Sequence, residues 1–219
     1  MDLLWWQWVI IIVCSYFIGN ISVSRFIARS KNQDITQLGS GNPGSTNVLR
    51  NYGFKYGILN LCLDIFKGVI PCLVVWLTTH EIVVLYAAGI SVMLGHMFPV
   101  IFKFKGGKGI ATMLGVFAVA NPLATVIVIA CAAICWLIFQ YGSLSSFLCV
   151  TVLTVVEGIK AKSLDNPHRL IVSLLLFSIF LLTWWAHRAN IKRLLLGKES
   201  KVDLIASAKK KIKNNTVGK

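Results

Sequence analysis

The sequence predicts an all-α protein that crosses a membrane about seven times, and three observations support this fold class. Hydrophobic residues make up 56% of the chain and charged residues only 14%, whereas a soluble domain carries about 25% charged residues. The mean hydropathy is +0.73. The apolar residues also gather in segments near the roughly 20 residues that a spanning helix needs. A bilayer is the solvent that suits this composition, and no separate soluble domain fits beside the segments.

Seven apolar segments follow one another, and each is expected to form a membrane helix. The fourth is short for a crossing and ends at Asn121-Pro122, so its full span is left open, and Pro71 predicts a kink in the second. Together they form one integral membrane domain over residues 1–199, followed by a Lys-rich tail, 200–219, that is expected to be disordered. The segments are 3–27, 53–78, 82–98, 109–120, 123–140, 143–159 and 169–186.

The distribution of charge predicts the orientation of the chain. The net charge is +14, from 22 Lys and Arg against 8 Asp and Glu. With seven spans, the loops after the first and third segments and the tail share one side, and most basic residues lie there. Because cytoplasmic loops carry the excess of Lys and Arg, the N-terminus is expected outside and the C-terminus in the cytoplasm. The exception is the loop with Lys160, Lys162 and Arg169. We interpret the basic charge as a feature of cytoplasmic loops and of a tail that contacts anionic membrane lipid, and not as a sign of nucleic-acid binding.

The cysteines do not indicate a metal site or a disulfide framework. All six lie inside apolar segments, and no histidine or carboxylate is near Cys131 and Cys135, which are one helical turn apart. Cysteines in such a setting behave as small apolar residues. No metal is therefore expected at the cysteines. No cofactor is expected either.

The first polar stretch, residues 39–50, reads Gly-Ser-Gly-Asn-Pro-Gly-Ser-Thr-Asn-Val-Leu-Arg. Glycines let successive backbone N–H groups turn toward a bound anion. Arg50 adds a guanidinium that can clamp a phosphate or a carboxylate. An ordinary loop between helices is the alternative. The candidate anion-binding residues here are Ser40, Gly41, Asn42, Gly44, Thr46, Asn47 and Arg50.

The second stretch, residues 95–109, contains His96 and a glycine-rich basic turn that ends in Lys108 and Gly109. It is not a nucleotide-binding P-loop, because the first glycine of that motif is missing and Gly109 replaces its Ser or Thr. The turn leads into a helix whose first N–H groups attract anions, and Lys108 can neutralise a phosphate. His96 can bind substrate, move a proton or satisfy a loop carbonyl, and the sequence leaves these roles open.

The third stretch, residues 187–199, repeats His187, Asn190 and Arg193 at three-residue spacing. A helix would place them along one stripe, as a polar face or as a basic end that reaches the membrane surface. Inside the second segment, Asp64 and Lys67 also share a helical face. A charged pair inside a membrane is costly, so it is interpreted as a structural ion pair or as a support for the lysine or histidine of a site.

These stretches together resemble the PlsY family of acyl-phosphate:glycerol-3-phosphate acyltransferases. The family patterns are G-S-G-N-x-G-[AS]-T-N with a following Arg, then G-H-x-F-P with F-K-G-G-K-G-x-A-T, then H-R-x-N-I-x-R-L-L-x-G-x-E. Here they fall at residues 39–50, 95–112 and 187–199. The resemblance implies seven membrane helices, a cytoplasmic site in the inner membrane, no metal and no acyl-CoA. No histidine is followed by the aspartate of the H-x4-D motif found in other glycerolipid acyltransferases.

The resemblance implies transfer of an acyl group from acyl phosphate to glycerol 3-phosphate, giving lysophosphatidic acid and inorganic phosphate. A separate acyltransferase that makes acyl phosphate is the implied functional partner. Our working mechanism has the first loop hold the acyl phosphate head through Ser40, Asn42 and Asn47. The proton acceptor is His96 or a substrate phosphate oxygen, with a covalent acyl-Ser40 as a less favoured third. The phosphate of glycerol 3-phosphate is assigned to Arg50, Lys108, His187 and Asn190.

Two other classes of protein share some of these features. A small anion transporter also has several spans and a short segment, but transporters place their site near the membrane midplane. In this chain the polar stretches are expected at one face. A scaffold subunit would not need two glycine-rich anion loops and a polar helix end.

Overall fold

The structure, a computed structural model, describes residues 3–201 and contains no β-strand in that range. Its helices confirm the all-α fold class. The predicted tail lies outside the described residues apart from Ser200 and Lys201. The helices are α1 (Trp5–Gly19), α2 (Val23–Arg29), α3 (Ser45–Tyr52), α4 (Phe54–Thr79), α5 (Ile82–Met97), α6 (Ile110–Ala120), α7 (Pro122–Phe139), α8 (Gly142–Lys160), α9 (His168–Ala186) and α10 (Arg188–Leu195), with short 3-10 turns η1 (Ile35–Gln37), η2 (Val100–Phe102) and η3 (Ala161–Ser163).

Every predicted apolar segment is helical over most of its length, and among the described residues six helical stretches are long and apolar enough to cross a membrane. The fourth segment is α6, which has only 11 residues. At 1.5 Å per residue it is about 16 Å long, roughly half of a 30 Å hydrocarbon core. It therefore does not cross alone. The chain turns at Asn121, whose side chain caps α7 by accepting a hydrogen bond from Ala124 N.

The first apolar segment differs from the prediction of one continuous helix over residues 3–27. It is broken at Asn20–Ser22 into α1 and α2. Hydropathy does not reveal the break, because a tertiary contact stabilises it: Lys67 Nζ of α4 donates to Ile21 O at 2.9 Å. Helix α4, in contrast, runs from Phe54 to Thr79 through Pro71.

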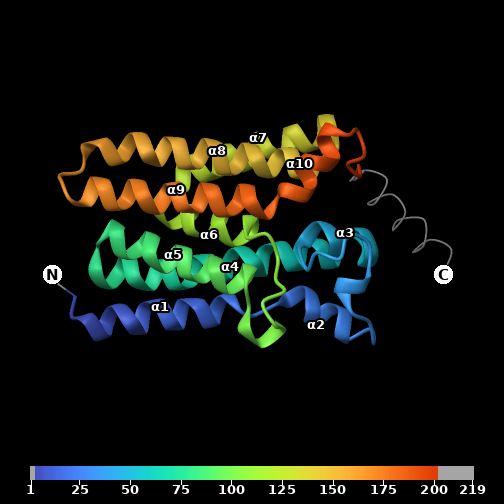
Figure 1. Cartoon of the computed structure of the whole chain (residues 1–219), viewed down its shortest axis with the longest axis horizontal. Coiled ribbons are helices and arrows are strands. Elements are labelled where there is room, and N and C mark those ends of the chain that lie inside the picture. The colour runs from blue at the N-terminus through green and yellow to red at the C-terminus, as the bar shows by residue number, and fades with distance from the viewer. Residues whose placement is uncertain (1–2, 202–219) are drawn as a thin grey trace.

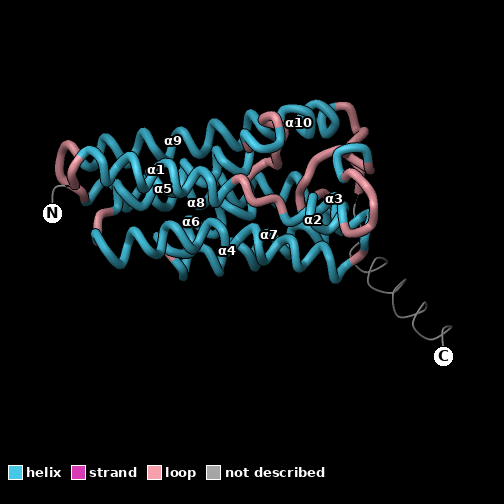
Figure 2. Tube along the Cα trace, turned by 90° about the horizontal axis from the view of Figure 1, so that it is seen from below, coloured by secondary structure: helices cyan, strands magenta, loops and turns pink. Residues whose placement is uncertain are grey.

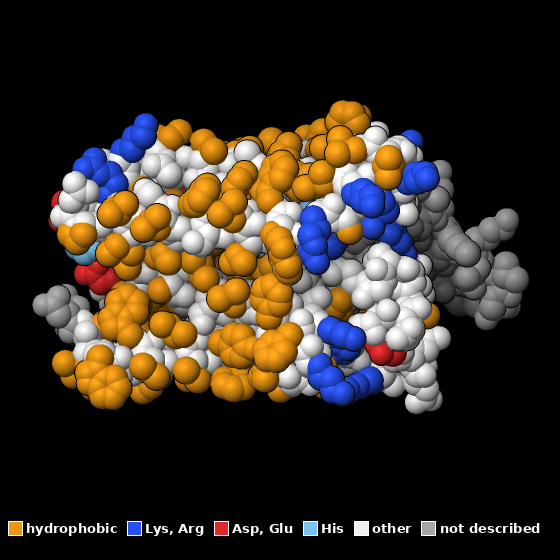
Figure 3. Space-filling model, in the orientation of Figure 1, with side chains coloured by type: hydrophobic (Ala, Val, Ile, Leu, Met, Phe, Trp, Pro, Cys, Tyr) orange, Lys and Arg blue, Asp and Glu red, His pale blue; other side chains and the backbone are white. Residues whose placement is uncertain are grey.

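The long helices lie side by side as a bundle, with the short helices α2, α3 and α10 at one end (Figures 1 and 2). The three polar stretches of the sequence meet at this end. A belt of apolar side chains covers the face seen in Figure 3, and Lys and Arg gather mainly at the end with α3 and α10. Large apolar side chains are exposed along the long helices, among them Phe66, Leu77, Ile138 and Phe177, as a surface in contact with lipid requires. The orientation of the two termini across the membrane stays a prediction.

Glycines bring the helices into close contact. A Cβ added at Gly68 of α4 would overlap Thr112 O, and a Cβ at Gly115 of α6 would overlap Ile65 O. Gly19 of α1 and Gly95 of α5 meet in the same way. Small residues at such crossings let helix backbones approach, which is how membrane helices gain packing energy. The α4–α6 contact fixes the short helix against a long one.

Gly115→Ala is expected to lower the free energy of unfolding by about 1–3 kcal/mol, the usual cost of overpacking. The new methyl would meet a backbone oxygen that no side-chain rotation can move aside. Gly158→Ala in α8 is the matched control, because nothing lies within 4 Å of its added Cβ. The control should be neutral or slightly stabilising, since alanine is the better helix former by up to about 1 kcal/mol. Thermal unfolding in detergent, followed by circular dichroism, compares the two. Equal melting temperatures would contradict the close α4–α6 contact.

Candidate functional site

Asn47 of α3 shapes the first glycine loop. Its Oδ1 accepts from Ser40 N at 3.0 Å, and its Nδ2 donates to Leu38 O at 2.9 Å and to Ile35 O at 3.3 Å. The side chain is 1% exposed. Gly39 and Gly41 have φ values of +54° and +69°, which favour glycine because other residues meet a steric penalty there. Asn47 thus contacts the loop backbone, whereas Ser40 at the loop tip is exposed.

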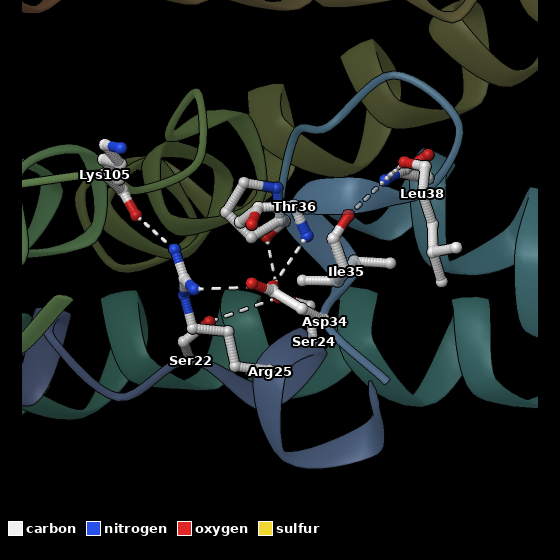
Figure 4. A network of polar contacts seen from close by, with 10 residues as sticks. Ser22, Ser24, Arg25, Asp34, Ile35, Thr36, Leu38 and Lys105 are labelled. Carbon is white, nitrogen blue, oxygen red and sulfur yellow. Dashed lines mark hydrogen bonds and ion pairs between the residues drawn. The ribbon is translucent and has the colours of Figure 1, made fainter. Parts of the chain in front are cut away.

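Arg25 of α2 joins the first loop to the second, as Figure 4 shows. Its guanidinium donates to Lys105 O at 2.6 Å and lies 3.9 Å from Asp34 Oδ1. It also lies over the Phe102 ring, 4.5 Å from the centroid. In the same network Ser24 Oγ donates to Pro43 O at 2.9 Å. Helix α2 therefore contacts both glycine loops through Ser24 and Arg25, a role that no motif in the sequence indicated.

His96 lies beneath the second loop, at the end of α5. Gly107 N donates to His96 O at 3.1 Å, and a Cβ at Gly107 would overlap His96 Nε2. Gly106 and Gly107 leave no room for a Cβ, because the His96 backbone carbonyl lies against the first and the His96 ring against the second. From the same loop, Lys108 Nζ donates to Asn190 Oδ1 of α10. The second and third polar stretches meet through this contact.

His187 ends α9 and is 3% exposed. Its Nδ1 lies 2.9 Å from Thr183 O. Because a carbonyl oxygen only accepts hydrogen bonds, Nδ1 carries the proton. Burial lowers the pKa of His187 to about 4, and the charge of Lys108 acts in the same direction. The ring is neutral near pH 7, so its Nε2 is a hydrogen-bond acceptor.

Glu199 organises the third polar stretch. Its carboxylate accepts from Asn190 Nδ2 at 2.6 Å, from Arg193 Nε at 2.7 Å and from Ser143 Oγ at 3.0 Å. Burial alone would raise the pKa of Glu199, but these donors and the Arg193 charge lower it. The residue is therefore an anion that orients Asn190 and Arg193. The sequence marked Glu199 only as the end of a motif and gave Ser143 no role.

The cations of the site come from three elements. Arg50 of α3 donates to Ser200 O at 2.8 Å, which places it beside the segment that carries Glu199. Burial lowers the pKa of Lys108 to about 8, helped by Arg193 and Arg50, while Glu199 acts in the opposite direction. Arg193 thus pairs with the Glu199 carboxylate, and Arg50 and Lys108 lie near enough to interact with its charge. Such a cluster can bind a phosphate group.

The structure brings most of the predicted site residues to one end of the bundle. Thr46 lies beside Gly142, with its Oγ1 3.6 Å from an added Cβ there, and the next residue, Ser143, bonds Glu199. Gly41, Asn42 and Gly44 complete the neighbouring loop. Ser40 makes no hydrogen bond to a histidine or lysine among the described residues. Within residues 3–201, no group of His, Cys, Asp and Glu side chains could hold a metal ion.

Comparison with known proteins places the chain in a family. The family model described as "Glycerol-3-phosphate acyltransferase" matches residues 9–197. A glycerol-3-phosphate acyltransferase of Halalkalibacterium halodurans is 40% identical over 207 residues, which cover 92% of this chain and 97% of that protein. One from Finegoldia magna is 42% identical, covering 87% and 93%.

Two solved structures have the same fold. The crystal structure of PlsY, an integral membrane glycerol 3-phosphate acyltransferase, in its glycerol 3-phosphate form has a TM-score of 0.83 at 33% identity and covers 91% of this chain and 98% of that one. The lysophosphatidic acid form has a TM-score of 0.80 at 34% identity, with 91% and 97% covered. With the family model spanning nearly the whole chain and both structures matching the bundle, the chain belongs to the PlsY family of integral membrane glycerol-3-phosphate acyltransferases.

Proposed function

We propose that the chain moves an acyl group from acyl phosphate to glycerol 3-phosphate, giving 1-acylglycerol 3-phosphate and inorganic phosphate. The observation that carries this proposal is the pairing of two anion sites at one end of the bundle. One is the glycine loop around Ser40 to Gly44, and the other is the cation cluster of Arg50, Lys108 and Arg193. Both substrates in this reaction carry a phosphate, so two adjacent anion sites are what it requires.

The donor supplies the activation in this scheme. The glycerol hydroxyl oxygen attacks the acyl carbonyl carbon, the new ester bond forms, and the bond from that carbon to the phosphate oxygen breaks. Because an acyl phosphate is a reactive donor, no protein nucleophile is needed. Positioning two anions and stabilising the charge of the transition state can supply most of the rate. The exposed position of Ser40, without a basic partner, supports direct transfer over an acyl-Ser40 intermediate.

The cation cluster and the polar residues beside it have separate roles in this scheme. Arg50 and Lys108 hold the phosphate of glycerol 3-phosphate, while Asn190 orients Lys108. His187, with Nε2 free to accept, holds a glycerol hydroxyl. A neutral ring of low pKa is a weak base, so this contact positions the hydroxyl without taking its proton.

The hydroxyl proton passes to a phosphate oxygen or to His96. The covered position of the His96 ring, with Nε2 against Gly107, favours the phosphate oxygen. Gly41, Asn42, Gly44 and Thr46 offer donors for the acyl phosphate head, whose chain lies among the apolar helices. Asn47 acts in this scheme by fixing the loop.

The location of the reaction is part of the proposal. The basic end with α2, α3 and α10 faces the cytoplasm of the inner membrane, following the rule that Lys and Arg concentrate on that side. There the enzyme would receive acyl phosphate from a separate acyltransferase that makes this donor.

The donor is tested with purified chain, palmitoyl phosphate and glycerol 3-phosphate, with palmitoyl-CoA as the comparison. We expect lysophosphatidic acid and inorganic phosphate in equal amounts from acyl phosphate and no product from the thioester. Product from palmitoyl-CoA alone would overturn the proposed donor. If the chain instead exchanges phosphate across the membrane of reconstituted vesicles and forms no product, a transporter is favoured. If it shows neither acyl transfer nor exchange, a scaffold is favoured.

The protonation of Lys108 predicts a basic limit to substrate capture. Its amine is charged below a pKa of about 8, so raising the pH through 8 removes a cation from the anion site. We expect kcat/KM for glycerol 3-phosphate to fall up to about tenfold per pH unit above 8, because kcat/KM reports groups of the free enzyme.

Lys108→Arg is the matched variant, since arginine keeps its charge throughout this range. It should be slower at pH 7 but should lose the decline between pH 8 and 9.5. An unchanged decline in the variant would show that another group sets it. Steady-state rates measured from pH 6.5 to 9.5 decide between the two outcomes.

A further inference from the structure

Asp64 is a buried carboxylate inside the span of α4, with one oxygen in an ion pair and the other accepting a hydrogen bond. Oδ1 lies 2.7 Å from Lys67 Nζ, and Oδ2 accepts from Asn60 Nδ2 at 2.8 Å. The residue is 3% exposed. Burying a carboxylate costs several kcal/mol in desolvation, which an ion pair only partly offsets. If the Asp64–Lys67 pair only joined two turns of α4, apolar residues would serve as well at a lower desolvation cost. A further role for the pair is therefore indicated.

Each partner of Asp64 contacts a different irregular segment. Lys67 donates to Ile21 O, in the break between α1 and α2. Asn60 donates from the same Nδ2 to Ser45 Oγ at 2.8 Å, and Ser45 is the first residue of α3 after the first glycine loop. The carboxylate thus connects the broken first span to the first loop.

The second glycine loop is connected through His96. Its Nδ1 lies 3.8 Å from Asp64 Oδ1, beyond hydrogen-bond distance but within range of the charge. The His96 carbonyl accepts from Gly107 N, and the ring lies against Gly107. A change in the position of this ring would therefore move the turn that carries Lys108.

We propose that Asp64 and Asn60 are positioning residues for acyl transfer, which set the two glycine loops relative to each other. Asp64 acts on the first loop through Asn60 and Ser45. It acts on the second loop through Oδ1, the oxygen that pairs with Lys67 and faces the His96 ring. Neither residue contacts substrate in this proposal. Misplacing a reacting group by about 1 Å can cost roughly a hundredfold in rate. The proposal rests on the transferase activity proposed above, because it needs a turnover to measure.

The chain offers a matched control at the other end of the bundle. Glu157 of α8 is 4% exposed, accepts from Tyr86 OH at 2.8 Å and Asn121 Nδ2 at 2.7 Å, and lies 3.4 Å from Lys160 Nζ. It is a buried carboxylate with a lysine three residues later, as Asp64 is with Lys67, although the Lys160 side chain is exposed. It also lies far along the chain from all three polar stretches. Removing it tests what the loss of a buried carboxylate does by itself.

The experiment compares Asp64→Asn/Lys67→Met with Glu157→Gln/Lys160→Met in full-length protein. Neither double variant leaves a buried lysine without its carboxylate. We expect the first to lose about a hundredfold in kcat/KM and the second to stay within about twofold, both counted per folded molecule. Asn60→Ala, which keeps the ion pair, should raise KM for the acyl donor by tenfold or more and leave KM for glycerol 3-phosphate within about twofold. Wild-type rates for Asn60→Ala, or equal losses in the two double variants, would overturn the proposal.

Hydrogen exchange gives a second measurement that does not depend on turnover. Backbone exchange in residues 39–46 should rise in Asn60→Ala, and exchange in residues 39–46 and 105–109 should rise in Asp64→Asn/Lys67→Met. The Glu157→Gln/Lys160→Met variant should change neither loop. Unchanged exchange in both loops of the Asp64 variant would overturn the proposal even if the wild type used a different acyl donor. Failure of the wild type to turn over acyl phosphate would, in contrast, count only against the proposed donor. If Asp64→Asn/Lys67→Met does not fold, Asn60→Ala decides the outcome alone.

Discussion

The structure depends on satisfying irregular backbone at the edge of a membrane. In hydrocarbon, an unpaired N–H or C=O costs several kcal/mol, so non-helical backbone survives only where protein groups satisfy it. Asn47 supplies these groups for residues 35–40, Arg25 for the Lys105 carbonyl, and Lys67 for the Ile21 carbonyl. Tyr16 adds another by donating to Phe98 O at 2.7 Å. Most of the polar side chains around the loops therefore have a structural partner, and the exposed loop tip is what is left for a ligand.

The same burial sets the electrostatics of the cation cluster. An interaction between charges strengthens as the surroundings become less polar, so the partly buried Lys108 attracts an anion more strongly than a surface lysine would. Arg50 and Arg193 add their charges from more exposed positions. Their mutual repulsion would spread an unoccupied cluster, and Glu199 opposes this by binding Asn190 and Arg193. A substrate phosphate can then add to an arrangement that is already formed. Such preorganisation is what a reaction without a protein nucleophile relies on.

Hydropathy predicted the helical segments and motif order predicted the polar stretches that the structure brings together, because both depend on composition and local spacing. The segment ends agree with α4 and α5 within a few residues, and the three polar stretches share one end of the bundle. The break at Asn20–Ser22 could not be read from the sequence, since it needs a donor from α4. The roles of Arg25, Ser143 and Glu199 also depend on contacts between distant segments. For Asp64 and Lys67 the sequence gave the helical pairing, but not their links to Ile21 and Ser45.

The length of α6 explains how Lys108 comes to be partly buried. The helix ends at Asn121, where the chain turns into α7. Its side is held by the Gly68–Gly115 crossing with α4. Because 11 residues extend only about 16 Å, the helix must begin well short of the full depth that a spanning helix covers, and the Lys108–Gly109 turn begins there with it. The N-terminal N–H groups of α6 and the Lys108 amine therefore reach into the bundle together, where the helix dipole and the cation attract the same anion. If α6 were long enough to cross the membrane, this turn would lie farther out in water. The attraction of an anion to the helix dipole and to Lys108 would then be weaker.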